Sequence, residues 1–222
     1  MYRGARDRQP RYYRVRDVYV VVLDYMPNGN PLDRHQHHRS SPIAQVIGTK
    51  YLSLVELIPP PGQHLNIGER IYVEQSLRGF QGPRLGERLM WQELTGIAKD
   101  NLPSVLRDIL IEKERVYTEF FNVASSINIR LHMFELLPGI GKKSLETLLS
   151  ERKKKPFESF KDIAQRAKIS DPVKPLMDRI ILELMGGEKY YLFVEPPRDA
   201  TDVVFFKMLD YLYARVNYRE PW

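Results

Sequence analysis

A run of ten residues, from Leu136 to Leu145, constrains the fold of this chain more than any other segment. Its sequence is Leu-Leu-Pro-Gly-Ile-Gly-Lys-Lys-Ser-Leu, and apolar stretches lead into it and out of it. Proline fixes φ and ends a helix, while glycine adopts backbone angles that are closed to other residues. The run therefore predicts a tight hairpin between two helices over 127–150, with Ser125 or Ser126 capping the first helix.

The second helix of this hairpin would begin with backbone amides that have no partner within the helix. The two glycines leave no side chain over these amides, and two lysines follow at once. Amides at the positive end of a helix dipole form an anion site, which nearby cations strengthen. We therefore expect a phosphate-binding turn, with further attraction from a lysine run downstream. The residues predicted to bind nucleic acid are Pro138, Gly139, Ile140, Gly141, Lys142, Lys143, Ser144, Lys153, Lys154 and Lys155.

Positive charge is concentrated in two segments of the 222-residue chain, whose net charge is +6. Residues 1–16 carry six arginines and one aspartate, and residues 140–168 carry nine basic and four acidic side chains. Clustered positive charge is typical of proteins that bind a polyanion. Residues 1–16 also contain Tyr2, Tyr12 and Tyr13, and few aliphatic residues. We expect a mobile basic arm that follows a phosphate backbone while tyrosine stacks on a base.

The first third of the chain has the pattern of a small β domain. Short β-rich segments are separated by turn residues, which predicts a small barrel or open sheet over 17–90. The predicted strands cover 18–25, 43–47, 51–58, 65–73 and 84–90, with a long loop over 27–42. A helical domain is expected over 91–187, ending at Gly186 and Gly187, so the fold class is α+β: a small OB-like barrel followed by helices.

Within the helical domain, Asn101 is expected to cap a helix that has Pro103 in its first turn. A second hairpin is expected near 169–175. It lacks glycine, and Asp171 would repel a phosphate, so we expect it to pack structurally. Residues 188–222 form an aromatic extension, with a strand over 190–194 and a helix capped by Thr201. We expect this extension to dock on the body; the alternative is that it binds a protein partner.

Composition excludes several kinds of site. The chain has no cysteine, which rules out disulfides, cysteine-ligated zinc and iron–sulfur clusters. No apolar run approaches the roughly 18 residues of a membrane span. The arginine-rich N-terminus is not followed by the apolar segment of a secretory signal. We therefore expect a soluble cytoplasmic protein that has no cofactor and no membrane contact.

Three histidines lie close together in the loop over 27–42. His35, His37 and His38 could together bind Zn²⁺ or Ni²⁺. Metal ligands are usually held on rigid elements and oriented by further hydrogen bonds. A loop rich in proline, asparagine and arginine is a poor support, so we predict incidental loop histidines and assign no metal site.

Two motifs in this chain resemble a known nucleic-acid-binding unit. The Leu-Pro-Gly-Ile-Gly turn resembles the helix-hairpin-helix motif, which grips a backbone phosphate without reading sequence. Residues 156–163, Pro-Phe-Glu-Ser-Phe-Lys-Asp-Ile, resemble the connector that leads to a second hairpin. With segments 21–27 and 42–48, the chain resembles an archaeal family, domain of unknown function 655, over about residues 17–185. The resemblance implies an OB-like domain plus a helix-hairpin-helix domain and no established activity.

The main enzymatic alternative is a DNA glycosylase-lyase, whose catalytic lysine and aspartate have a spacing similar to Lys143 and Asp162. A lysine amine of lowered pKa can attack a sugar C1′ and form a Schiff base. However, Asp162 belongs to the connector, where we expect it to help start a helix, and the N-terminal half has a β pattern. No catalytic residue is therefore predicted. A further alternative is a protein-interaction module of the translation or transcription apparatus.

We therefore expect a non-catalytic protein that binds a nucleic-acid backbone without sequence specificity. Phosphate contacts position a nucleic acid but do not specify its sequence. RNA is slightly favoured over DNA, because small barrels of this kind are common in RNA-binding proteins.

Overall fold

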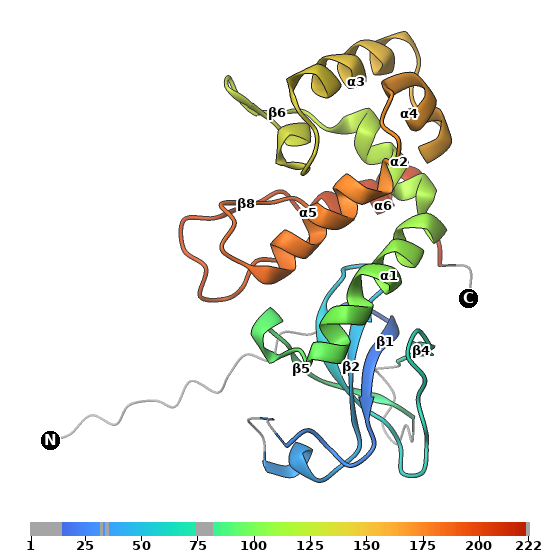
Figure 1. The fold of residues 1–222 in the computed structure, drawn as a ribbon, viewed down its shortest axis with the longest axis vertical. Coiled ribbons are helices and arrows are strands. Elements are labelled where there is room, and N and C mark those ends of the chain that lie inside the picture. The colour runs from blue at the N-terminus through green and yellow to red at the C-terminus, as the bar shows by residue number, and fades with distance from the viewer. Residues whose placement is uncertain (1–14, 32, 34–35, 74–81, 221–222) are drawn as a thin grey trace, which may run out of the picture.

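The computed structural model describes residues 15–31, 33, 36–73 and 82–220. Within them the fold is α+β, with a five-stranded antiparallel sheet at one end of the long axis and helices α3 and α4 at the other (Figure 1). Of the predicted basic arm, residues 1–14 lie outside the described residues, as does His35. The helical end carries the glycine turn, over 138–144, for which the sequence predicts phosphate binding.

Every predicted strand of the N-terminal domain is present, most of them shorter than expected. The strands are β1 (Tyr19–Met26), β2 (Ile43–Gly48), β3 (Leu54–Ile58), β4 (Arg70–Tyr72) and β5 (Arg84–Arg88), in the order β4-β1-β2-β3-β5. All pairings are antiparallel. The loop over 27–42 contains one short 3₁₀ helix, η1 (Gln36–Arg39).

The sheet is open, which corrects the expectation of a small closed barrel. Its edge strands, β4 and β5, make no ladder with each other in the described residues. β4 has only three residues, and the pairing of β5 with β3 shifts register between Val55 and Leu57. Neither β4 nor β5 is therefore long and regular enough to pair with the other edge strand over several residues. Both faces are buried without closure: Leu23 and Ile47 join the helical core, while Val22 and Val46 belong to a second cluster on the other face.

Helix α1 (Gly96–Glu112) joins the sheet to the helical half and packs on β1 and α5 (Val173–Met185). Its N-cap is Thr95, whose Oγ1 accepts from the Ala98 amide at 3.0 Å and donates to Asp24 Oδ2 at 2.6 Å. The predicted cap, Asn101, is wrong. It lies inside the helix and donates to the Leu23 carbonyl at 3.0 Å, and Pro103 also lies within α1. Thr95 is the N-cap because its hydrogen bonds to Asp24 and Gln45 of the sheet fix the start of α1 at this residue.

The predicted first helix of the hairpin, over 127–137, is wrong. Helix α2 (Glu114–Val123) is followed by a small hairpin of β6 (Ser126–Asn128) and β7 (Leu131–His132), then by the 3₁₀ turn η3 (Met133–Leu136). Asn128 Oδ1 accepts from the Arg130 amide at 2.8 Å, a side-chain turn that competes with a helix. Neither Ser125 nor Ser126 caps a helix here.

The second helix of the hairpin is confirmed as α3 (Lys142–Lys154), and α4 (Phe160–Ala167) and α5 follow it. Gly186 ends α5 with a φ of 84°, which a residue with a side chain rarely adopts. This end agrees with the predicted boundary at the glycine pair.

The aromatic extension docks on the body. It contains β8 (Tyr190–Tyr191), the parallel strand β9 (Val204–Phe205) and α6 (Met208–Val216), which packs on α2. The strand over 190–194 is shorter than predicted, because the amides of Leu192, Phe193 and Val194 donate to the buried carboxylate of Glu183. The predicted Thr201 cap is wrong: α6 begins only at Met208, after a left-handed residue.

Candidate nucleic-acid interface

The turn between η3 and α3 is anchored from beneath. The Ile140 amide donates to the Leu137 carbonyl at 3.1 Å, and both side chains are buried in the helical core. Gly139 has a φ of +83° and is exposed. Leu137 and Ile140 therefore hold a rigid turn whose glycine side faces outward.

Gly141 leaves the start of α3 open. As the N-cap residue it supplies no side-chain hydrogen bond to the first amides of the helix, and no acidic residue lies in the first turn. A Cβ atom added at Gly139 or Gly141 would meet no protein atom within 4 Å. Lys142 and Lys143 are both exposed beside it. The arrangement presents helix amides, a positive dipole end and two ammonium groups to one approaching anion.

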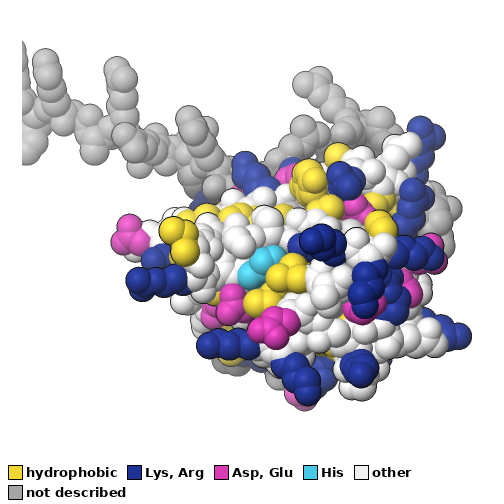
Figure 2. All heavy atoms as spheres, turned by 90° about the horizontal axis from the view of Figure 1, so that it is seen from above, with side chains coloured by type: hydrophobic (Ala, Val, Ile, Leu, Met, Phe, Trp, Pro, Cys, Tyr) yellow, Lys and Arg dark blue, Asp and Glu magenta, His cyan; other side chains and the backbone are white. Residues whose placement is uncertain are grey.

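Lys153, Lys154 and Lys155 are exposed at the opposite end of α3. Thirteen residues at 1.5 Å each separate the two ends by about 20 Å. Lys154 pairs with Glu151, and Lys155 pairs with Glu158 at 2.8 Å. The structure does not bring this run to the turn. It places the run on the same end of the molecule, where Figure 2 shows lysine and arginine predominating over acidic side chains.

Two arginines counted in the basic segment have structural partners instead. Arg152 donates to the carbonyls of Phe121, Asn122 and Ala124 at the end of α2, the shortest at 2.7 Å. Arg166 donates to the carbonyls of Glu151, Lys155 and Pro156. Nothing in their sequence neighbourhood separates these arginines from the exposed lysines, so sequence analysis counted them all alike.

His132, at the N-terminus of η3, lies near Arg152. Its Nδ1 accepts from the Phe134 amide at 3.1 Å, and its own amide donates to Glu135 Oε2. Burial, aided by the positive charge of Arg152, lowers the pKa of His132. The neutral imidazole is therefore the form that caps η3.

The connector after α3 is structural. Phe157 is buried, and its amide and carbonyl both bond the Asn122 side chain, at 2.7 and 2.9 Å. Ser159 Oγ accepts from the Asp162 amide at 3.1 Å and so caps α4. The expectation that Asp162 helps start a helix is confirmed.

Lys143 and Asp162 do not form a common site. The Asp162 carboxylate accepts from the Glu158 amide and pairs with Arg166 at 3.0 Å, and Arg166 also contacts Glu151. Glu151 lies eight residues beyond Lys143, about 12 Å along α3. The spacing in the sequence therefore does not become a lysine–aspartate pair in space.

The second turn, between α4 and α5, packs structurally as predicted. Asp171 pairs with Arg107 of α1 at 2.7 Å and accepts from the Val173 amide at 3.1 Å. The turn bends at Lys168, which has a φ of 55°. The second turn therefore has the Asp171 carboxylate beside its first helix amides, whereas the first turn leaves the corresponding amides open.

One exposed apolar residue was missed by sequence analysis. Ile129, at the tip of the β6–β7 hairpin, is fully exposed and is followed by exposed Arg130. Figure 1 shows this hairpin projecting from the same end of the molecule as α3. The Asn128 turn was the signal that could have identified the tip.

A cavity of about 350 Å³ lies between β5 and the C-terminal segment. Its wall includes Arg88, Trp91, Glu183 and Val194. The Glu183 carboxylate already accepts from three backbone amides and from Arg179, and Arg88 pairs with Glu195 at 3.2 Å. Glu183 and Arg88 of this wall thus hold the fold together.

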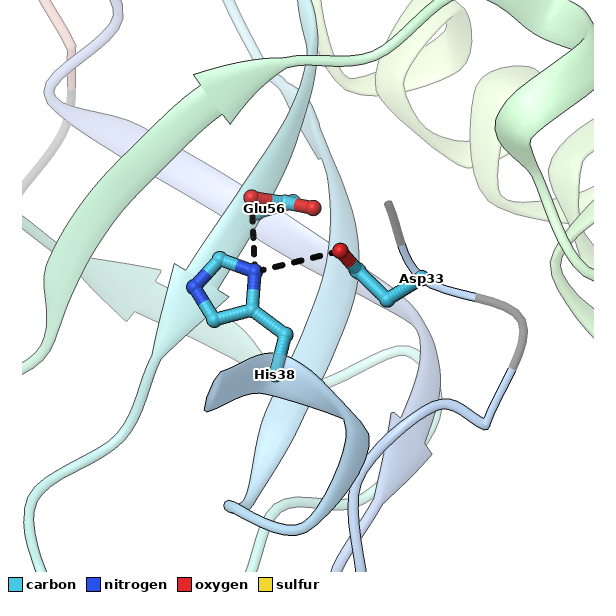
Figure 3. Close-up of side chains that lie close together, drawn as sticks. All are labelled: Asp33, His38 and Glu56. Atoms are coloured by element: carbon cyan, nitrogen blue, oxygen red, sulfur yellow. Dashed lines mark ion pairs between the residues drawn. The ribbon is translucent and has the colours of Figure 1, made fainter. Parts of the chain in front are cut away.

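The loop over 27–42 places one histidine in a buried polar cluster. His38 Nδ1 lies 3.5 Å from Asp33 Oδ1 and 3.4 Å from Glu56 Oε2 (Figure 3). Burial, aided by the charge of Asp33, raises the pKa of Glu56 to about 7. His38 is therefore not an incidental loop residue. His35 and the side chain of His37 lie outside the described part of the chain.

A family model described as a protein of unknown function, DUF655, matches residues 16–195. The chain belongs to this family. An uncharacterised protein of Methanocaldococcus jannaschii, MJ0038, is 36% identical over 179 residues, which is 80% of this chain and 79% of that protein. The crystal structure of Af1531 from Archaeoglobus fulgidus, a DUF655 protein, is similar with a TM-score of 0.72 at 41% identity. It covers 81% of this chain and 100% of its own.

The DUF655 match includes the sheet, the glycine turn over 138–144 and α5, and it ends before β9 and α6. The archaeal relationship agrees with the resemblance seen in the sequence. No helix among the described residues is both long and apolar enough to cross a lipid bilayer.

Proposed function

We propose that this DUF655 protein is a non-catalytic nucleic-acid-binding protein whose helix-hairpin-helix-like turn, residues 138–144, holds a backbone phosphate. The observation that carries the proposal is the open N-terminus of α3 at Gly141. Its amides have no side-chain cap, no protein atom lies within 4 Å of the position a Cβ would take, and two exposed lysines flank it.

A polymer suits this surface better than a single small anion. Exposed lysines continue beyond the turn, from Lys153 to Lys155 along α3 and to Lys161 and Lys168 on and after α4. Separated charges add attraction to a ligand that carries phosphates at regular intervals. Since these are backbone contacts, the proposed binding does not depend on base sequence.

We further propose that the open sheet acts as an OB-like module for single strands. Tyr19 on β1 and Tyr72 on β4 lie side by side, with ring centroids 5.2 Å apart, and Tyr72 is 48% exposed. Aromatic rings on a sheet provide stacking surfaces for unpaired bases. Such stacking suits single strands of RNA and of DNA alike.

The test reverses the two lysines of the turn. Lys142→Glu/Lys143→Glu should weaken binding to a labelled RNA or DNA duplex by about tenfold or more at low salt, because two charge-assisted contacts are lost. It should also flatten the salt dependence of the binding constant, by roughly one unit of slope for each lost contact. Fluorescence anisotropy over a salt series measures both quantities.

Lys189→Glu/Lys207→Glu is the matched control. It makes the same change in net charge at two exposed positions outside the turn. The control should keep most of the affinity and the wild-type slope. Equal losses in the two double variants, or none in either, would contradict the proposed role of the turn. Crosslinking in cells with sequencing of both polymers would then identify RNA or DNA.

A further inference from the structure

A buried cluster at the far end of the sheet combines two carboxylates and one imidazole, two of them from the loop over 27–42 and one from β3. Asp33 comes from the loop over 27–42, His38 from η1 and Glu56 from β3, and Figure 3 shows the three side chains converging. Their exposed fractions are 8%, 6% and 2%. None of these residues belongs to the glycine turn over 138–144, which lies at the other end of the molecule (Figure 1).

The separations within the cluster suit a metal ligand set better than a hydrogen-bonded triad. The two N–O distances are 3.4 and 3.5 Å, and all three candidate ligand atoms lie within 4.8 Å of one another. Charge-assisted hydrogen bonds are shorter, about 2.7–2.9 Å. Ligands of a tetrahedral zinc ion, bonded at 2.0–2.2 Å, lie about 3.3–3.5 Å apart. Octahedral Mg²⁺ ligands, at 2.0–2.1 Å, would lie closer, at about 2.9 Å.

One carboxylate oxygen of the cluster also favours a cation. Two carboxylates face one imidazole in a buried space. Glu56 Oε2 is buried and accepts no hydrogen bond from any residue that the structure describes. A buried charge without full compensation is costly. A divalent cation at the centre of the three atoms would neutralise both carboxylates and use this oxygen.

Hydrogen bonds join the described residues of the loop that carries two of the ligands. The Asn30 amide donates to the His38 carbonyl at 2.8 Å, and Arg39 Nε donates to the Asp33 carbonyl at 2.7 Å. Gly29, with a φ of +85°, lets the backbone of residues 38–40 approach to 2.5 Å of the position its Cβ would take. The objection that such a loop is a poor support for ligands therefore does not hold for His38.

We propose that Asp33, His38 and Glu56 bind a divalent transition metal ion, with Zn²⁺ the best match, and that the ion fastens the loop over 27–42 to the sheet. Imidazole nitrogen and carboxylate oxygen are ligands that zinc accepts. Water or the second oxygen of a carboxylate completes four-coordination. The site is structural, because its ligands are buried and the bound ion joins a loop to a strand.

Tag-free full-length protein, stripped with a chelator and dialysed against micromolar ZnCl₂, should retain one zinc ion per chain by elemental analysis. Its melting temperature should rise on zinc addition, because the ion binds the folded state. Co²⁺ should give the visible absorption of a tetrahedral site. His38→Gln and Glu56→Gln should lose the retained ion and the absorption, while the control His64→Gln, at an exposed histidine of the same half, keeps both.

Circular dichroism of each variant shows whether it is folded, and the Co²⁺ spectrum of the wild type tests the geometry without any variant. No retained zinc in the wild type, or full retention in His38→Gln, would overturn the site. Preferential binding of Mn²⁺ or Mg²⁺ with no tetrahedral Co²⁺ band would overturn the assignment to zinc.

Discussion

At the scale of single residues, the two glycines of the phosphate-binding turn have different requirements. Gly139 has a φ of +83°, a conformation that side chains disfavour. Gly141 has extended backbone angles, φ −88° and ψ 178°, that any residue adopts. Sequence motifs treat the two positions as equivalent, whereas in the structure only Gly139 needs the backbone freedom of glycine. Access by a ligand is the role that we propose for Gly141.

This difference predicts opposite phenotypes for two alanine variants. Gly139→Ala should lower the free energy of unfolding by about 1 kcal/mol, since alanine is strained at positive φ. Gly141→Ala should leave stability nearly unchanged and weaken nucleic-acid binding, because its methyl group enters the open space through which a phosphate would approach the turn. Urea denaturation and anisotropy titrations measure the two effects. Wild-type affinity in Gly141→Ala would show that the turn has only a structural role.

The pH dependence of stability should carry a contribution from His132. Burial and Arg152 lower its pKa in the folded protein below the ordinary value of about 6.5. Between these two values the unfolded chain binds a proton that the folded chain does not, so protonation favours unfolding. Stability is therefore complete above pH ~6.5 and falls as the pH is lowered through the window beneath it.

His132→Asn isolates this contribution. Asparagine can accept the same Phe134 hydrogen bond without titrating. The variant should show a shallower loss of stability than the wild type between about pH 7 and pH 5, as measured by chemical denaturation at each pH. Parallel pH profiles for the two proteins would exclude a role for this imidazole.

At the scale of elements, the sequence predicted strands better than helix boundaries. The strands were found because β-rich runs alternate with turn residues, and the long apolar stretches of α1 and α2 marked those helices. The segment 127–137 was assigned to a helix because a short apolar run does not distinguish helix from strand. The Asn128 side chain favours a hairpin over a helix here, because it accepts a hydrogen bond from the Arg130 amide in a local turn. Thr95 outcompeted Asn101 as a cap because of its contacts with the sheet, which no local pattern reveals.

The candidate site was predictable to the same extent. The glycines and lysines of the turn form a local motif, so Gly141, Lys142 and Lys143 could be proposed from the sequence directly. The roles of Arg152 and of the Asp33–His38–Glu56 cluster depend on residues that are distant in the chain, and a single sequence does not show such pairings.

Arg152 provides an element-scale prediction. It terminates α2 by donating to three carbonyls, so Arg152→Ala should lower the free energy of unfolding by about 2 kcal/mol, because those acceptors lose charged donors. Lys153→Ala, at the adjacent exposed position, should leave stability within about 0.5 kcal/mol and slightly weaken nucleic-acid binding. Denaturation and binding curves for both variants separate the roles. Equal stability of the two variants would contradict a structural role for Arg152.

At the scale of the whole molecule, the sheet and the helices share one core. A single cluster of buried side chains includes Leu23 and Ile47 of the sheet, Leu106 of α1 and Leu212 of α6. Lys113, between α1 and α2, is fully buried, and its ammonium donates to the Thr49 carbonyl at 2.8 Å and to Glu220. The Lys113 ammonium thus links three parts of the chain: the β2–β3 turn, the α1–α2 junction and the segment that contains Glu220.

Glu220→Gln should destabilise the whole protein. Burial lowers the pKa of Lys113, and Glu220 is the carboxylate that opposes this effect most strongly. Removing one partner of a buried ion pair costs about 3 kcal/mol, since the other charge stays buried without compensation. Arg219→Gln, at the exposed neighbouring position, is the control. Thermal denaturation should show a much lower melting temperature only for the first variant; the same melting temperature in both would refute the buried pair.

Ion pairs between residues that are distant in the sequence also affect the order in which the protein folds during synthesis. Arg16 pairs with Asp210, 194 positions away, and Lys113 pairs with Glu220, 107 positions away. Contacts between distant positions slow folding, because long loops must close first. Synthesis proceeds from the N-terminus at about 5–20 residues per second. The sheet therefore emerges from the ribosome many seconds before α6, and Lys113 has no carboxylate partner from Glu220 until residue 220 has been added.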